Sequence, residues 1–93
     1  MQEFKGSKGP WRYLPAFGEV KSEKSGLIAD LVVNGNEDEN GRLIAAAPEL
    51  LEACLRIQAQ FRQSGIESKA GSLNPIEDSA AQIDAVILKA LGQ

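Results

Sequence analysis

The chain has 93 residues, a formal net charge of −3, one cysteine and no histidine. This length fits one domain with a modest core, and the acidic balance disfavours direct binding to a nucleic-acid backbone. The single cysteine excludes an internal disulfide, and the missing histidine removes the commonest general base and metal ligand. We therefore expect a non-enzymatic protein without metal or cofactor.

The first third of the chain predicts a small antiparallel sheet. Residues 1–9 are polar and are predicted to form a flexible arm ahead of a single domain, residues 10–93. An aromatic-rich segment, residues 10–17, favours a strand that Pro15 restricts to an edge or a bulge. A second, shorter strand is expected around Val20. The sheet of two to three strands is predicted to span about residues 10–33.

The clearest strand is "LIADLVV", residues 27–33, which is rich in β-branched residues and is followed by an Asn-Gly pair. Side chains alternate along a strand, so every second residue shares a face. One face is then wholly apolar and is expected to meet the helices; it holds Leu27, Ala29, Leu31 and Val33.

The stretch "NGRLIAAAPELLEACL", residues 40–55, favours a helix at nearly every position but contains Pro48. Inside a helix a proline removes a hydrogen bond and costs ~3 kcal/mol, whereas at the first helical position its cost is small. The sequence therefore predicts a helix over about 38–46, a bend at Ala46–Ala47, and a second helix over about 48–63.

A third helix is predicted over about 75–91, because Asn74 is a favoured N-cap, Pro75 suits the first helical position and Glu77 completes a pattern like a capping box. One face of it is apolar: Ile76, Ala80, Ile83, Ile87, Ala90 and Leu91, widened by Val86. Two to three helices packed on a small antiparallel sheet make an α+β fold.

Basic and aromatic residues gather in "KGPWRY", which contains Lys8, Trp11, Arg12 and Tyr13. An indole beside basic groups can hold a nucleotide by stacking and charge. Tryptophan, tyrosine and arginine also dominate the binding energy of protein interfaces. Alternatively, Trp11 is the largest core residue of a small domain. The residues alone leave these three interpretations open.

Three polar residues complete the candidate ligand- or partner-binding set: Asp30, Asn40 and Arg42. Asp30 projects from a strand face that also bears apolar residues. We expect it to be half-buried against Arg12 or Arg42, either in a structural ion pair or at a ligand.

The motifs "KGPWR", "GLIADL" and "NGRLIAAAPELLEACL" occur in this order and resemble a widespread group of very small phage and prophage proteins. The matching positions are Gly9, Pro10 and Trp11 in the first motif, Ile28 and Ala29 in the second, and Asn40, Arg42 and residues 43–51 in the third. Gly41 stands where this group usually has alanine, and glycine weakens a helix by about 1 kcal/mol relative to alanine. The resemblance implies a phage origin and does not imply a reaction.

By analogy with small phage accessory proteins, the leading hypothesis is a protein that inhibits a bacterial immune component, such as a CRISPR-type effector, by stoichiometric binding. A first alternative is a sponge that sequesters a small nucleotide immune signal in a pocket of Trp11, Arg12, Arg42 and Lys8. A second alternative is a regulatory or assembly accessory protein of the phage.

The expected location is the cytoplasm of the infected bacterium. The start "MQEFKGSKGP" lacks the apolar run of a signal peptide, and no apolar stretch approaches the ~20 residues that span a bilayer. We therefore expect no membrane partner. So small a sheet with short helices leaves apolar surface uncovered, which favours a homodimer.

Overall fold

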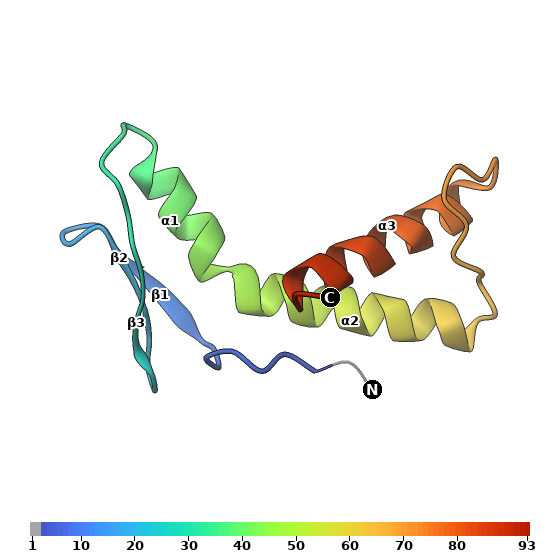
Figure 1. The fold of residues 1–93 in the computed structure, drawn as a ribbon, viewed down its shortest axis with the longest axis horizontal. Coiled ribbons are helices and arrows are strands. Elements are labelled where there is room, and N and C mark those ends of the chain that lie inside the picture. Colours follow the sequence, from blue (N-terminus) through green and yellow to red (C-terminus); the bar gives the residue numbers. More distant parts are fainter. Residues whose placement is uncertain (1–2) are drawn as a thin grey trace. The chain divides into compact units, whose positions relative to one another are not determined.

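A computed structural model describes residues 3–93 and shows an α+β fold, as predicted (Figure 1). In chain order the elements are β1 (Trp11–Leu14), β2 (Glu19–Ser22), β3 (Gly26–Asp30), α1 (Glu37–Ala45), α2 (Ala47–Gln63) and α3 (Pro75–Ala90). The chain forms two compact units. The sheet unit is residues 5–50, and the hairpin unit comprises residues 51–93 with residues 3 and 4. Residues 1 and 2 of the predicted arm lie outside the described residues.

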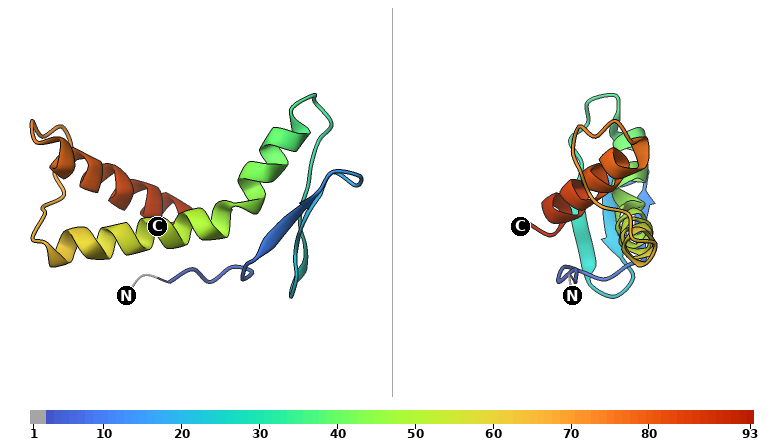
Figure 2. Two further views of the ribbon diagram at one scale, coloured as in Figure 1. Left: turned by 180° about the vertical axis from the view of Figure 1, so that it is seen from behind. Right: turned by 90° about the vertical axis from the view of Figure 1, so that its right-hand side faces the viewer.

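The sheet unit is an antiparallel meander in the order β1-β2-β3, with α1 packed against β1 and β2 (Figure 2). The register places Tyr13 opposite Val20, and Val20 opposite Ala29. Val20 is fully buried, and it is the centre of this small core. One helix on one face of three short strands therefore buries little apolar surface, as expected for an element of this size.

The predicted apolar face of the third strand is wrong, because the ladder between β2 and β3 is irregular. Val20 pairs with Ala29 but Lys21 pairs with Leu27, so Ile28 is an extra residue in β3. A one-residue slip moves the following side chains to the other face. Ala29 shares the covered face with Val20, whereas Leu27 lies beside Lys21 and is largely exposed. The strand also ends at Asp30, before the predicted residue 33.

The helix is interrupted at Ala46, as the position of Pro48 predicts. α1 ends at Ala45, and α2 begins at Ala47 with the amide of Leu50 donating to the Ala46 carbonyl at 2.9 Å. Pro48 thus lies in the first turn, where its missing N–H removes no helical hydrogen bond.

The hairpin unit contains most of α2 and all of α3, which run in opposite directions, diverge toward the loop and are joined by residues 64–74 (Figures 1 and 2). Its buried residues are Gln58 from α2 and two apolar residues from α3, Ala80 and Ile87. Much of the predicted apolar face of α3 is therefore exposed, including Ile76 and Val86.

The start of α3 follows the prediction with one difference. The Asn74 side chain caps the helix by accepting from the Ile76 amide at 3.1 Å, and Pro75 occupies the first turn. The Glu77 carboxylate accepts from the Ser72 hydroxyl at 2.7 Å, and that hydroxyl accepts from the Asn74 amide at 3.1 Å. Ser72 therefore bridges the two groups that a capping box joins directly.

Candidate functional site

The contact between β1 and α1 is built on Tyr13 and Gly41. A Cβ atom placed on Gly41 would lie 2.7 Å from Cγ of Tyr13 and nearer still to Cδ1 and Cε1. Gly41 is itself buried. Only glycine lets the ring lie this close to the helix backbone, so the glycine at this position serves packing.

The Tyr13 hydroxyl donates to the Asp38 carboxylate at 2.6 Å. This hydrogen bond raises the pKa of Tyr13 to about 12, helped by desolvation and by the negative charges of Asp38 and Glu37, while Arg42 opposes the shift. The ring and hydroxyl of Tyr13 thus attach β1 to the first turns of α1. Its hydroxyl is a donor held by a carboxylate and is poorly suited to act as a base.

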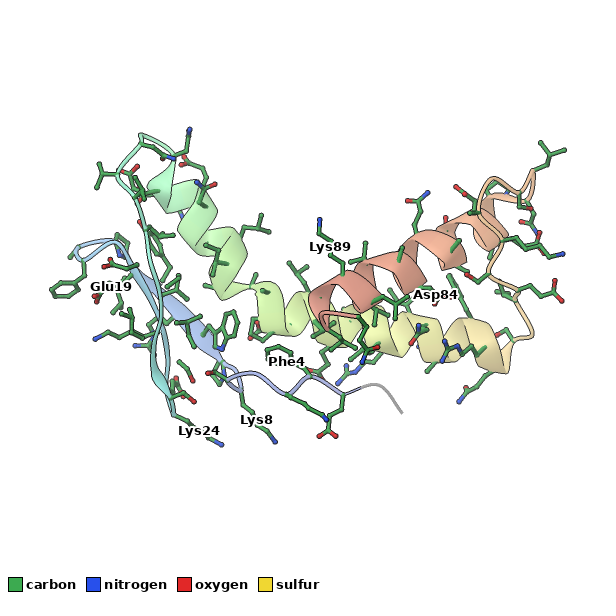
Figure 3. The ribbon with its side chains drawn as sticks, viewed as in Figure 1. Phe4, Lys8, Glu19, Lys24, Asp84 and Lys89 are labelled. Atoms are coloured by element: carbon green, nitrogen blue, oxygen red, sulfur yellow. The ribbon has the colours of Figure 1, made fainter. Side chains whose placement is uncertain are left out.

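Trp11 and Tyr13 are separated from each other by one residue in β1, so both side chains lie on the covered face of the sheet. It is half-buried, and its indole Nε1 donates to the Ser7 carbonyl at 3.2 Å. The buried Ser22 hydroxyl donates to the Lys8 carbonyl at 2.9 Å. The backbone of residues 7 and 8 is thereby attached to the sheet, while the Lys8 side chain projects into solvent (Figure 3).

Gly9 brings the first and third motifs together. A Cβ on Gly9 would lie 3.0 Å from Cβ of Pro48 and 3.4 Å from its Cγ. The glycine of "GPW" therefore packs on the proline that starts α2. This contact gives both residues a structural role that neither motif indicates by itself.

Arg12 lies on the face of the sheet opposite Trp11. Its guanidinium is 3.5 Å from the Glu23 carboxylate, and both side chains are exposed. A shallow hollow of about 200 Å³ on this side is lined by Arg12, Leu14, Lys21, Ser22 and Glu23. The two faces of β1 therefore keep Trp11 and Arg12 apart, and the structure does not form the joint pocket predicted for a nucleotide.

The three polar candidates outside "KGPWRY" are all exposed: Asp30, Asn40 and Arg42. The predicted burial of Asp30 against an arginine is wrong, because Asp30 ends β3 opposite Glu19 and forms no ion pair within residues 3–93. Asn40 and Arg42 lie on α1, whose Gly41 faces the sheet between them. Neither of them has a hydrogen-bonded side chain in the described part of the chain.

Three exposed apolar residues that the sequence did not predict as a surface lie near one end of the sheet, and we name them the sheet-end patch: Phe17, Val32 and Val33. Phe17 lies in the β1–β2 turn, and the valines follow β3; their exposed fractions are 71, 79 and 82 %, respectively. The Leu31 amide donates to the Gly18 carbonyl at 2.8 Å, which joins the two segments. The signal in the sequence is the apolar run before Asn34, which strand propensity assigns to the buried strand.

The sheet-end patch has an acidic border. Glu19 and Asp30 face each other across β2 and β3 at this end, whereas Lys8 and Lys24 lie toward the opposite end (Figure 3). The Glu37 carboxylate accepts from the amides of Asn34 and Gly35 at 3.1 and 2.7 Å. Hydrogen bonds from its own amide and then from that of Asn34 lower the pKa of Glu37. The carboxylates of Asp30 and Glu37 therefore adjoin the patch, while that of Glu19 lies 3.9 Å from Nζ of Lys21.

The hairpin unit contains a second hollow, the hairpin cleft, of about 280 Å³; it is lined by Gln58, Phe61, Arg62, Ile66, Ser68, Ala80 and Asp84. Gln58 is only 7 % exposed and donates from Nε2 to the Asp84 carboxylate at 2.7 Å. This bond, with a further one from Ser68 and the charge of Arg62, lowers the pKa of Asp84. Figure 3 shows Asp84 between the two helices.

The whole length of the chain, residues 1–93, matches the family described as Salmonella phage P22 protein Y8K6. The chain belongs to this phage protein family. No curated protein and no solved structure matches it. The phage origin implied by the motifs is thereby confirmed, while the family name states no activity.

Within residues 3–93, no helix has the length and apolar character needed to cross a bilayer. The same residues contain no group of three or more potential metal-ligating side chains. The candidate sites in the described residues are the sheet-end patch and the two shallow hollows.

Proposed function

We propose that this phage-family protein is a non-enzymatic inhibitor that binds a protein of the bacterial immune system, and that the sheet-end patch is its contact surface. The observation that carries the proposal is the exposure of Phe17, Val32 and Val33 at one end of the sheet. Full burial of each such side chain contributes about 1.5–3 kcal/mol. An exposed aromatic residue is also a common centre of binding energy in protein interfaces.

The acidic border of the patch selects the kind of partner. Glu19, Asp30 and Glu37 surround or adjoin apolar side chains, which suits a partner whose apolar recess is bordered by lysine or arginine. Immune effectors that grip nucleic acid carry such positive surfaces, because they must neutralise phosphates. An acidic binder can occupy that surface without a reaction.

The open edge of β3 offers a second mode of contact. β3 pairs with β2 on one side only, and the strand-forming residues 31–33 continue from it without joining the sheet. An exposed strand edge presents unpaired amides and carbonyls that a partner strand can pair with. The partner could therefore extend the sheet while the patch supplies the apolar contact.

The test is protection of a sensitive phage in bacteria that each carry one immune system. We expect the protein to restore plaque formation against one system and to co-purify with a component of it at a fixed molar ratio. The double variant Phe17→Asp/Val33→Asp should lose both effects. Leu73→Asp makes the same apolar-to-acid change at a fully exposed site in the hairpin unit and should keep both.

Two results would count against this proposal. One is the absence of protection against every immune system tested. The other is protection that persists when the protein is far below the concentration of its target, since a stoichiometric inhibitor is consumed by binding.

The hairpin cleft favours a second candidate function, sequestration of a small nucleotide. A cleft of about 280 Å³ is close to the lower end of ligand-pocket volumes. Phe61 offers an aromatic surface for a base and Arg62 a charge for a phosphate. Within the described residues no donor reaches Oε1 of the buried Gln58, which leaves an acceptor for an exocyclic amino group.

This alternative separates from the first by a thermal unfolding assay with a panel of linear and cyclic nucleotides. A ligand at 100 times its Kd should stabilise the fold by about 2.7 kcal/mol. Arg62→Ala should abolish the shift, whereas Arg56→Ala removes an exposed arginine outside the cleft and should preserve it. A flat response to the whole panel would reject the sponge and leave the protein-binding proposal intact.

A further inference from the structure

The hairpin unit presents an apolar stripe that its own helices leave open. Along α3, apolar or small residues recur at alternating steps of three and four: Ile76, Ser79, Ile83, Val86 and Ala90. This spacing forms one line on a helix surface and is the spacing of a coiled-coil seam. Ile76 and Val86 are 50 and 55 % exposed, although the residues that pack toward α2, Ala80 and Ile87, are buried.

A matching stripe lies on α2. Ile57 is 38 % exposed and directly precedes the buried Gln58, as Val86 directly precedes the buried Ile87. Cys54 and Phe61 follow the same spacing and are half-buried, with Phe61 at the border of the hairpin cleft. Moving back by one residue rotates the direction of the side chain by the same angle about the axis of each helix. Because α2 and α3 run in opposite directions, this rotation turns both stripes to the same side of the hairpin (Figure 1). We call this side the hairpin face.

We infer that the hairpin face binds a second copy of this chain, so that α3 of each copy packs antiparallel against α3 of the other. The sizes of the α3 residues are self-complementary in that arrangement. A twofold axis near Ile83 places Ser79 against Val86 of the second copy, and Ala90 against Ile76. Small residues then oppose large ones, as close packing of a helix interface requires.

Charge favours a second copy as the occupant. α3 has acidic Asp78 in its first turn and basic Lys89 in its last. Stacking two hairpins about a twofold axis brings antiparallel helices together, so acidic ends meet basic ends. Within residues 3–93 Lys89 forms no ion pair, and Figure 3 shows it pointing away from α2.

Sedimentation equilibrium of the whole chain tests the inference. We expect a species of twice the 10.0 kDa chain mass. Val86→Glu should raise the dimer dissociation constant by about a hundredfold or more, because each copy would bury a carboxylate without a partner. Ala85→Glu adds the same charge to the neighbouring exposed residue outside the stripe and should leave the constant unchanged.

Disulfide trapping tests the register without a destabilising change. In a Cys54→Ser background, Ile83→Cys should form a covalent dimer rapidly upon oxidation, and Ala85→Cys should form it slowly. A monomeric wild-type chain at high concentration, equal effects of the two glutamate variants, or equal trapping rates at positions 83 and 85 would each overturn the inference. None of these outcomes bears on the sheet-end patch, which lies in the other unit.

Discussion

Replacing Gly41 with alanine should destabilise the sheet unit, although alanine is the better helix former. In an exposed helix the change would gain about 1 kcal/mol. Here the added Cβ would lie 2.7 Å from Cγ of Tyr13 and closer to two other ring atoms, so the ring or the helix must move. Forcing extra volume into a packed contact costs about 1–3 kcal/mol. Displacing the ring also breaks its hydrogen bond to Asp38.

We expect a net loss of about 2 kcal/mol, which lowers the Tm of a chain of this size by roughly 10 °C. Thermal or urea unfolding followed by circular dichroism measures it. Asn40→Ala, at the neighbouring exposed position of α1, should be neutral or slightly stabilising. In a Tyr13→Val background the cost of Gly41→Ala should vanish, because the ring that it meets is gone. A gain in Tm for Gly41→Ala alone would refute the packing argument.

Three further predictions follow from single contacts. Tyr13 is the chain's only tyrosine, so its absorbance change should titrate with a pKa of about 12, and Asp38→Asn should return the pKa toward 10. Because the pKa of Tyr13 is raised in the folded state, the stability that its hydrogen bond to Asp38 contributes is fully present below pH 10 and is lost as the pH rises toward 12. A free energy of unfolding that is constant across this range would contradict the assignment of this hydrogen bond. Asn74→Ala should cost about 1 kcal/mol in urea unfolding through loss of the cap, while Asn74→Asp should retain most of it. Gly9→Ala should cost about 1 kcal/mol or more, because its Cβ would lie 3.0 Å from that of Pro48, and an unchanged unfolding midpoint would show that the contact can relax.

Local chemistry accounts for the parts of the fold that the sequence predicted well. The break before Pro48 and the start of α3 at Asn74 and Pro75 depend on residues adjacent to the helix ends. A missing amide or a capping side chain acts within one turn, so it can be predicted without tertiary information.

Features that depend on distant residues could not be predicted in this way. The alternation assigned to residues 27–33 assumed a regular ladder, but the extra residue Ile28 is defined only by pairing with β2. The glycine at position 41 is explained by Tyr13, which lies in another element.

The same distinction between local chemistry and distant contacts applies to the residues of the candidate site. Trp11 and Arg12 were grouped because they adjoin in sequence, yet neighbouring residues of a strand face opposite sides, and the predicted strand already implied their separation. Tyr13 proved to be a packing residue with a carboxylate partner. The exposure of Val32 and Val33 follows from where β3 stops, and strand propensity alone does not determine that end.

The contact between Gly9 and Pro48 brings the two ends of the sheet unit close together. Its entry and exit lie side by side, a geometry that tolerates insertion into another protein and circular permutation. The compact piece is therefore suited to insertion into another chain as one unit.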